Sequence, residues 1–403
     1  LIVGSLPYRE REIMRYVPNL DKAHIVYKFY MKSLIVKQIE DFKLEPDYLD
    51  IPKLTKDTAI LKVDACGLCG SDVEQFKGSF GYVSYPLIPG HEPIGTIIEI
   101  GSEAKNRWNV NIGDLVALEP HISCGSCFSC ISGNYHLCKV EAKKITWTGN
   151  QGLPAYGYMP MSYDHGLWGG YSQYMYLHPN TVLHKIPKKI PLEIASMYQA
   201  LAAGVRWAVQ VPKTSIGDTV LILGSGQRGL ASVIACKEVG AKNIIITGLK
   251  KDKHKLNLAK FFGANHTINI EEEDTIEKVM EYTNGQGVDV ILDVVPIATQ
   301  PIVEAIEVAK IGATIVLGGV KGKKSSLSID TDKILFKELT VRGVYSQGYE
   351  AYQESLRMLE ENKYDFSKLK THEFSLINAE KAIKTLYDKV DEEAICIHLN
   401  PNI

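Results

Sequence analysis

The chain has 403 residues, of which 45% are hydrophobic and 23% charged, so it is too long for one small domain and too ordinary in composition for a disordered or fibrous protein. Its 45 Lys and Arg residues nearly balance 47 Asp and Glu residues, which gives a formal net charge of -2. This balance argues against nucleic acid or an acidic membrane as a partner recruited by the overall charge.

The sequence contains no segment typical of membrane insertion or secretion. No stretch approaches the roughly 20 consecutive apolar residues of a spanning helix, and residues 1–30 are too charged for a signal peptide. We therefore expect a cytoplasmic protein. The sequence starts at Leu1, whereas Met31 begins a run, MKSLIVK, that is typical of a domain start. Residues 1–30 are interpreted as an N-terminal extension, with a misassigned start site as the alternative.

Two patterns of expected secondary structure follow each other along the chain. From Met31 to about Tyr176, short β-rich runs broken by Gly and Pro predict an all-β region: SLIVK, AILKV, PIGTIIEIG, DLVALEP and YSQYMYL. After Ile216, the strands TVLIL, NIIIT, VDVILDVV and ATIVLGG alternate with helical stretches, which predicts a parallel, doubly wound sheet. After about Val344, two amphipathic helices and a closing strand, EAICIHL, are expected.

One long irregular stretch interrupts the β-rich region. Residues 141–170 are rich in Gly, Pro and aromatic residues, among them Trp147, Tyr158 and Trp168. We predict that this stretch forms a substrate lid, because aromatic side chains can line a pocket. A misassignment of elements is the alternative.

Four of the eight cysteines lie within fifteen residues, in CGSCFSCISGNYHLC. The spacing of Cys124, Cys127, Cys130 and Cys138 allows four thiolates to surround one tetrahedral zinc ion. Four sulfur ligands leave no open coordination position, so the predicted site is structural. An iron-sulfur cluster, or a set of buried or disulfide-bonded cysteines, is the alternative.

A second metal site can be assembled from separate segments. A catalytic zinc needs protein ligands and an open position for the substrate oxygen. Cys69 lies in ACGLCGSD, and His91 and Glu92 lie in PGHEPIG, both in glycine-containing turns. Taken singly, Cys69 could be a small core residue, and a lone histidine is more often hydrogen-bonded than bound to metal.

A glycine pattern typical of dinucleotide binding follows the strand TVLIL. Gly224, Gly226 and Gly229 form GxGxxG ahead of an amphipathic helix. This context indicates close backbone approach to a pyrophosphate at the positive end of the helix, with a plain turn as the alternative.

The end of the next strand bears on the choice of cofactor. An NAD site usually carries Asp or Glu there to bind the ribose, but this chain has Gly248. A 2'-phosphate would not be repelled, and Lys250 or Lys251 could pair with it, which favours NADP over NAD. The alternative is that these lysines form a solvated charge run.

The motifs GLCGSD, GHEPIG, the four-cysteine segment and GxGxxG, in this order, resemble the zinc-dependent medium-chain dehydrogenase/reductase family, which includes alcohol and polyol dehydrogenases. The resemblance covers about Met31 to the C-terminus. It implies an α/β protein in which residues 31–200 form a GroES-like catalytic domain with a structural zinc lobe. Residues 201–344 would form a Rossmann NAD(P)-binding domain, and residues 345–403 would return to the catalytic domain.

The resemblance also assigns roles to residues. It implies that Cys69 and His91 bind the catalytic zinc, that Glu92 binds it directly or from an outer shell, and that the Ser71 hydroxyl contacts the alcohol oxygen. Gln199 takes the place of the remaining ligand, usually Cys, Asp or Glu. Because an amide oxygen is a weaker donor, Glu92 could be the third ligand and Gln199 a fourth contact or an outer-shell group; loss of the catalytic metal is the alternative.

A second departure concerns the proton path. Glu74 stands where many relatives carry the histidine that ends a proton relay. A carboxylate can also pass a proton, but its pKa would have to rise for it to work near neutral pH.

The resulting hypothesis is a zinc-dependent alcohol dehydrogenase that transfers hydride reversibly between NAD(P) and a small alcohol or carbonyl substrate, with Ser71 relaying the proton. Two alternatives remain open: a zinc-free NADPH-dependent reductase of conjugated carbonyls on the same fold, and a non-catalytic dinucleotide-binding relative. The resemblance also implies a homodimer or homotetramer.

Overall fold

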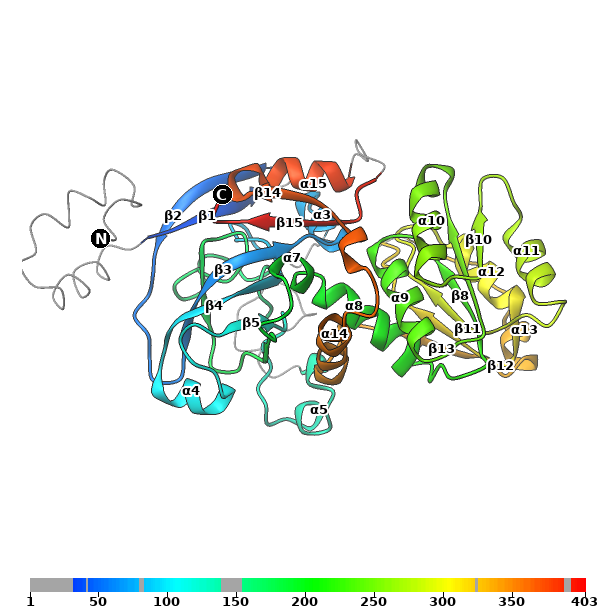
Figure 1. The fold of residues 1–403 in the computed structure, drawn as a ribbon, viewed down its shortest axis with the longest axis horizontal. Coiled ribbons are helices and arrows are strands. Elements are labelled where there is room, and N and C mark those ends of the chain that lie inside the picture. The colour runs from blue at the N-terminus through cyan, green and yellow to red at the C-terminus, as the bar shows by residue number, and fades with distance from the viewer. Residues whose placement is uncertain (1–31, 41–42, 80–82, 139–153, 323–324, 388–392) are drawn as a thin grey trace, which may run out of the picture.

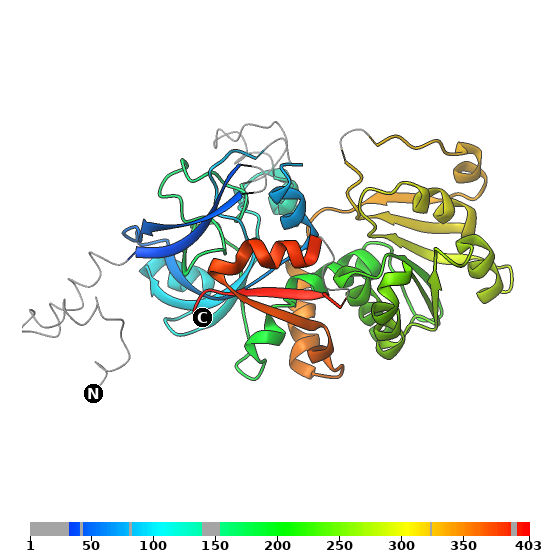
Figure 2. The same ribbon diagram turned by 90° about the horizontal axis from the view of Figure 1, so that it is seen from above.

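The computed structural model describes residues 32–40, 43–79, 83–138, 154–322, 325–387 and 393–403. The N-terminal extension predicted for residues 1–30 lies outside these residues. Two lobes lie side by side, a β-rich lobe that contains both ends of the described chain and an α/β lobe built from its middle (Figures 1 and 2). Helices α8 (Tyr198–Gly204), α9 (Gln227–Glu238) and α14 (Tyr349–Glu361) lie where the two lobes meet (Figure 1).

The β-rich lobe is built on a seven-stranded sheet. Its strand order is β14-β15-β3-β4-β5-β7, with β6 also paired to β3, and all pairs are antiparallel except β14 with β15. Strands β1 and β2 form a separate antiparallel pair. The strands are β1 (Lys32–Glu40), β2 (Lys43–Asp50), β3 (Ala59–Gly67), β4 (Glu92–Ile100), β5 (Leu115–Leu118), β6 (Tyr174–Leu177), β7 (Leu183–Lys185), β14 (Lys370–Ser375) and β15 (Cys396–Asn400).

The C-terminal segment therefore returns to the first sheet. Strand β15 pairs with β3 so that His398 lies opposite Gly67. This pairing places the end of the chain beside the turn that carries Cys69. The helices of this lobe and its C-terminal return are α3 (Gly70–Phe76), α4 (Ser102–Trp108), α5 (Phe128–Ile131), α7 (Leu192–Ala195), α14 (Tyr349–Glu361) and α15 (Ala379–Tyr387).

The second lobe confirms the predicted doubly wound sheet. Six parallel strands run in the order β10-β9-β8-β11-β12-β13, so that the chain starts in the middle and moves outward in each direction. The central strand β8, TVLIL, is buried along its whole length. The elements are β8 (Thr219–Leu223), α9 (Gln227–Glu238), β9 (Asn243–Gly248), α10 (Lys253–Phe262), β10 (His266–Asn269), α11 (Thr275–Tyr282), β11 (Val288–Asp293), α12 (Gln300–Val308), β12 (Ala309–Leu317), α13 (Thr331–Phe336) and β13 (Thr340–Gly343).

A continuous apolar core joins the lobes. Helix α8 (Tyr198–Gly204) runs into a π-helical turn, Val205–Gln210, and both pack on α9. At this crossing a Cβ on Gly204 would lie 2.6 Å from the backbone of Ala231, so only glycine allows the helices to approach this closely. The shared core fixes the position of the glycine loop relative to the β-rich lobe.

The described part of the segment predicted as a lid is mostly core. Tyr156 and Trp168 are buried, and the Tyr156 hydroxyl hydrogen-bonds Thr181 Oγ1 at 2.6 Å. Tyr158, which is only half-buried, reaches His91 with 5.2 Å between ring centroids. Trp147 lies outside the described residues. Aromatic residues here therefore fill the lobe, apart from Tyr158, which approaches the candidate site.

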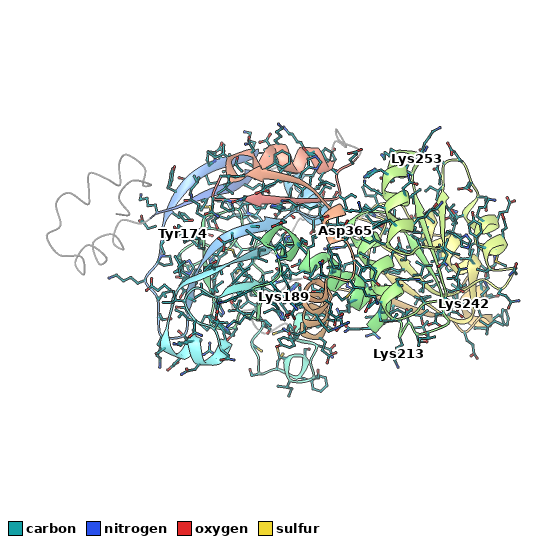
Figure 3. The ribbon with its side chains drawn as sticks, in the orientation of Figure 1. Tyr174, Lys189, Lys213, Lys242, Lys253 and Asp365 are labelled. Carbon is teal, nitrogen blue, oxygen red and sulfur yellow. The ribbon has the colours of Figure 1, made fainter. Side chains whose placement is uncertain are left out.

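The outer surface carries charges of both signs. Lys189, Lys213, Lys242 and Lys253, which Figure 3 labels, are exposed, and Lys189 Nζ lies 3.3 Å from Glu360 Oε1. Among the helices described, none is both long enough and apolar enough to cross a membrane.

Candidate active site

The turn between β3 and α3 positions Cys69. Cys69 is the N-cap of α3, and its backbone N–H donates to Asp72 Oδ2 at 2.8 Å. This bond ties the first turn of the helix to the residue that precedes it. At the end of β3, a Cβ on Gly67 would lie 2.8 Å from Glu92 Oε2, so glycine leaves room for that carboxylate. The sequence GLCGSD thus shapes a turn that faces Glu92.

His91 approaches Cys69 from the start of β4. Its Nε2 lies 3.3 Å from Cys69 Sγ, close to the roughly 3.5 Å that separates sulfur and nitrogen ligands on a tetrahedral zinc. Its Nδ1 lies 3.3 Å from Asp72 Oδ1. A carboxylate on Nδ1 favours the tautomer whose Nε2 lone pair can bind metal. Cys69, Asp72 and His91 are all buried and form a group that could hold a metal ion, called the metal-holding group below.

Ser71 lies at the same centre. Its Oγ is 2.6 Å from Cys69 Sγ and 3.3 Å from His91 Nε2. A hydroxyl in this position can contact an oxygen bound beside the thiol and imidazole. Its part in proton transfer stays a prediction.

Three buried oxygens here lack hydrogen-bond partners among the described residues: Glu92 Oε1, Gln199 Oε1 and Asp72 Oδ1, which lies beside His91 Nδ1. Glu92 Oε1 lies 3.7 Å from His91 Nε2, and burial raises the pKa of Glu92. A buried acceptor without a partner costs about 1–3 kcal/mol, which a bound cation would offset. The donor set therefore suits a metal ion at Cys69 and His91, while direct ligation by Glu92 or Gln199 stays a prediction.

Glu74 lies apart from this centre. Its Oε1 is 3.7 Å from Nζ of Lys77, the C-cap residue of α3. Among the described residues, no hydrogen bond or ion pair joins Glu74 to Cys69 or His91. Its predicted role at the end of a proton relay stays a prediction.

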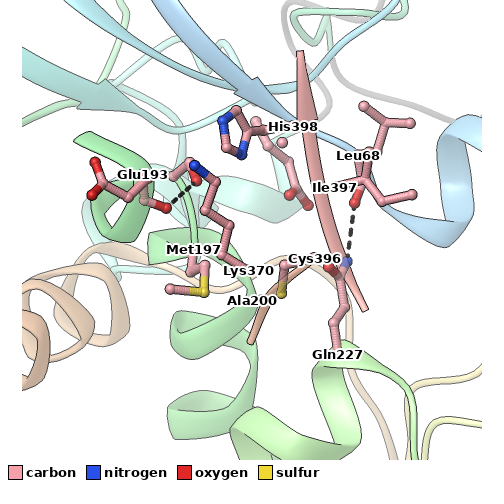
Figure 4. Close-up of a pocket in the computed structure, with 12 residues that line it drawn as sticks. Leu68, Glu193, Met197, Ala200, Gln227, Lys370, Cys396, Ile397 and His398 are labelled. Carbon is pink, nitrogen blue, oxygen red and sulfur yellow. Dashed lines mark hydrogen bonds between the residues drawn. The ribbon is translucent and has the colours of Figure 1, made fainter. Parts of the chain in front are cut away.

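The glycine loop after β8 brings the second domain to the site. Gly224 has a φ of 105°, and a Cβ on Gly229 would lie 1.9 Å from Gly224 O, so this turn requires both glycines. A Cβ on Gly226 would meet no atom within 4 Å, which leaves its outer side open to a ligand. Helix α9 starts next, and Gln227 Nε2 donates to Leu68 O at 3.3 Å (Figure 4).

A pocket lies where these segments meet (Figure 4). It is lined by the β3–α3 turn, α7 and α8, the start of α9 and the C-terminal strands, including Leu68, Glu92, Met197, Gln227, Lys370 and His398. The pocket therefore contacts both domains and the predicted ligand Glu92.

Sequence reasoning missed two residues at this junction, Asp72 and Arg228. Asp72 follows Cys69 by three residues at a predicted turn, a spacing that could have indicated a cap. Arg228, between two glycines of the loop, places Nη2 3.5 Å from Cys69 Sγ. Nothing in the local sequence signals a contact that joins two domains.

The adenosine side of the loop is free of a carboxylate at the predicted position. Gly248 ends β9, and a Cβ there would lie 2.7 Å from Ser225 Oγ, so the packing disfavours a larger residue. Lys250 Nζ lies 3.0 Å from Glu272 Oε1 on the surface. Lys251 follows it in the same helical turn, Lys250–Asp252.

The four remaining predicted ligands form a separate cluster. The sulfurs of Cys124, Cys127, Cys130 and Cys138 all lie within 4.8 Å of one another, and none is in a disulfide. Cys130 Sγ lies 3.8 Å from Cys124 Sγ and 3.5 Å from Cys127 Sγ, near the roughly 3.8 Å between ligands of a tetrahedral zinc site. Backbone N–H groups of Ser126 and Cys127 lower the pKa of Cys124 to about 6, which favours the thiolate.

Together these features define a two-domain oxidoreductase in which a dinucleotide fold faces a buried thiol–imidazole pair. The comparisons with known proteins agree. Residues 55–188 match the family model "Alcohol dehydrogenase GroES-like domain", and residues 229–361 match "Zinc-binding dehydrogenase".

Curated relatives span most of the chain. A probable alcohol dehydrogenase of Mycobacterium tuberculosis is 36% identical over 344 residues, covering 85% of this chain and 90% of the relative. An L-threonine 3-dehydrogenase of Pyrococcus furiosus is 31% identical, covering 84% and 92%. The chain belongs to the zinc-type medium-chain dehydrogenase/reductase family, a family of oxidoreductases, as its motifs predict.

Solved structures share the fold. An alcohol dehydrogenase of Thermotoga maritima has a TM-score of 0.79 and 25% identity, covering 92% of this chain and 99% of that chain. A candidate zinc-binding dehydrogenase of Sinorhizobium meliloti, bound to NADP, has a TM-score of 0.79 and 24% identity, covering 92% and 100%.

Proposed function

We propose that this protein is a zinc-dependent alcohol dehydrogenase that transfers hydride reversibly between a nicotinamide cofactor and a carbinol or carbonyl carbon. The observation that carries the proposal is the meeting of Cys69 Sγ and His91 Nε2, 3.3 Å apart, within reach of the residue Arg228 from the glycine loop. The relatives named alcohol and threonine dehydrogenases support the reaction class.

In this proposal Cys69 and His91 hold the catalytic zinc, with Glu92 and Gln199 available to complete its ligands. A bound zinc ion would supply an electrophilic charge that lowers the pKa of an alcohol oxygen. Asp72 holds the His91 ring with Nε2 facing Cys69. Ser71 Oγ, next to both ligands, takes the alcohol proton and passes it outward.

The glycine loop positions the cofactor. Gly226 leaves the start of α9 open, where the first N–H groups of the helix can bind a pyrophosphate. We propose NADP as the preferred cofactor, because Gly248 offers no carboxylate to repel a 2'-phosphate. The exposed Lys250–Glu272 pair is screened by solvent, so a phosphate can compete for the lysine. Equal or better turnover with NADH than with NADPH would contradict this preference.

The four-cysteine cluster would hold a second, structural zinc. Its four thiols complete a tetrahedron without an open position, so this metal stabilises its segment and takes no part in catalysis.

We further propose a cytoplasmic homodimer or homotetramer. All four residues of the edge strand β13 are exposed, which offers an edge for pairing with another subunit, and light scattering of the purified protein tests the oligomeric state.

A reductase of conjugated carbonyls that lacks the catalytic zinc and keeps the structural one is the second candidate, and the neutral Gln199 favours it. The two candidates differ in metal content, since the reductase would hold one zinc per subunit and the dehydrogenase two. A non-catalytic relative would hold cofactor without turnover, so NADP-linked oxidation of any alcohol eliminates it.

The deciding experiment measures the zinc content per subunit by elemental mass spectrometry, in the wild type and in Cys69→Ala. We expect two zinc ions in the wild type and one in the variant. The matched control is Cys66→Ala, which removes a neighbouring buried thiol outside the metal-holding group and should keep two. Two zinc ions in Cys69→Ala would contradict the ligand set, and one in the wild type would favour the reductase.

A further inference from the structure

Arg228 connects the glycine loop to the metal-holding group. It is the second residue of α9, yet its guanidinium extends into the other lobe, where Nη2 lies 3.5 Å from Cys69 Sγ. Its Cζ lies 4.9 Å from the centre of the Trp207 ring. The side chain thus lies where the cofactor domain meets the reacting centre.

The position of the guanidinium is fixed before any ligand arrives. Trp207 is buried, and its Nε1 donates to Ser346 O at 2.9 Å, so the ring that supports Arg228 cannot turn freely. An arginine stacked on an aromatic face keeps its planar fork available for a bidentate partner. Little side-chain entropy is then lost when a ligand binds.

This arginine lacks a carboxylate partner. Within the described ranges, no Asp or Glu oxygen lies within 4.0 Å of its nitrogens, and Cys69 Sγ is the acidic group it contacts. An arginine guanidinium is not deprotonated in proteins. The guanidinium therefore stays charged.

A zinc ion on Cys69 would change this balance. The thiolate charge would then be shared with the metal, and the guanidinium would face a divalent cation without an anion of its own. A half-buried charge in that position is costly unless an incoming group neutralises it. The required anion must lie next to the ligand sulfur, and therefore next to the reacting oxygen.

We propose that Arg228 binds the carboxylate of the substrate, so that this enzyme acts on hydroxy acids or the corresponding oxo acids. The inference rests on the proposed function. Because Nη2 lies only 3.5 Å from the ligand sulfur, the carboxylate is one or two carbons from the carbinol carbon. The pyrophosphate of the cofactor is a less suitable partner, since it is expected at the first N–H groups of α9 whereas the guanidinium extends toward Cys69.

The kinetic test uses the zinc-loaded enzyme with NADP. It compares kcat/KM for 2- and 3-hydroxybutyrate with kcat/KM for their amides, which lack the charge. We expect the wild type to favour the acid at least tenfold, Arg228→Leu to lose this preference, and Arg228→Lys to keep part of it because lysine offers no planar fork. Arg107→Leu, which removes an arginine from α4, should behave as the wild type.

A binding test does not depend on turnover. Isobutyrate, a carboxylate without a reactive hydroxyl, is titrated by calorimetry into the zinc-loaded enzyme with NADPH, and zinc content and melting temperature are recorded for each variant. We expect at least tenfold weaker isobutyrate binding in Arg228→Leu and unchanged binding in Arg107→Leu. Should Arg228→Leu fold poorly, Arg228→Lys carries the same comparison.

The outcomes separate the two proposals. An equal preference for acid over amide in the wild type and both Arg228 variants, with unchanged isobutyrate binding, would overturn the inference and leave the dehydrogenase function intact. Weakened NADPH binding with an unchanged acid preference would also overturn it, by assigning the guanidinium to the cofactor. If no alcohol is oxidised, the proposed function fails, and isobutyrate binding alone then decides the role of Arg228.

Discussion

Replacing Asp72 by Asn tests how the candidate metal site is held together. One carboxylate oxygen accepts the Cys69 N–H at 2.8 Å, and the other lies 3.3 Å from His91 Nδ1. Asparagine has the same shape but only one acceptor. If its oxygen stays on the Cys69 N–H, its NH2 group faces Nδ1, which must then accept, and the ring proton moves to Nε2.

A protonated Nε2 cannot bind metal, so the change should weaken zinc binding, although asparagine still fills the space that Asp72 occupied. If the amide flips instead, its NH2 group meets the Cys69 N–H and two donors face each other. Either way one contact with a charged carboxylate oxygen is lost, which is worth about 1.5–3 kcal/mol. This corresponds to zinc binding that is roughly tenfold to 150-fold weaker, in the range seen for residues that orient metal ligands.

The assay is competition for zinc with a chelator of known affinity, which resolves two classes of site in one titration. The four-cysteine cluster is distant in sequence and shares no ligand with Asp72, so its affinity is the internal reference. Asp64→Asn is the matched control, since it removes a β3 carboxylate that accepts from Thr96 Oγ1 at 2.5 Å and lies outside the metal-holding group. Zinc affinity at the Cys69 site that is the same in Asp72→Asn as in the wild type would refute the reasoning.

Three further predictions follow from single residues. Gly229→Ala should lower the melting temperature by several degrees, because its Cβ would overlap Gly224 O and overpacking costs about 1–3 kcal/mol, whereas Gly226→Ala should keep the melting temperature and weaken NADPH binding in calorimetry. His121 is buried, which lowers its pKa from 6.5 to about 3; the unfolded chain therefore binds the proton first, and stability falls as pH drops from 6.5 toward 3. Urea unfolding at pH 7.5 and 4.5 measures how much the free energy of unfolding falls between these pH values. The fall should be about 3 kcal/mol smaller in His121→Gln than in the wild type, and an equal fall in both proteins would contradict the assignment. Cys127→Ser should remove one zinc per subunit and lower the melting temperature, while retention of two zinc ions would show that this thiol is not a ligand.

The fold could be predicted from local patterns because those patterns have single causes. The run TVLIL is buried on both faces, and such apolar runs alternating with amphipathic helices arise where helices cover both sides of a parallel sheet. The location of the aromatic side chains before Gly170, in the core or around a pocket, is harder to predict. Tyr156 and Trp168 fill the core of the β-rich lobe, but irregular backbone carries no period that would distinguish buried rings from rings around a pocket.

The candidate zinc ligands and the glycine loop could be predicted because few residue types can fill these positions. Few arrangements other than a metal site place four thiols at such spacings, and the glycines of GxGxxG are required by contacts as close as the 1.9 Å that a Cβ on Gly229 would make. Asp72 and Arg228 act through partners 3 and 159 residues away, Cys69 in both cases. The second separation is set only by how the two domains pack, and no single segment of sequence encodes it.

Gln199 and Arg228 shift the charge of this site in the same direction. Gln199 is neutral where the family resemblance implies an anionic ligand, and Arg228 adds a positive charge beside Cys69. With the thiolate of Cys69 and the carboxylates of Asp72 and Glu92, a divalent ion and this guanidinium would leave no net charge in the centre. The oxidised nicotinamide ring then brings one positive charge, and a substrate carboxylate brings the matching negative one. A neutral alcohol supplies a negative charge only after it has lost its proton, whereas a hydroxy acid brings one when it binds, which is the electrostatic reason to expect selection for acids.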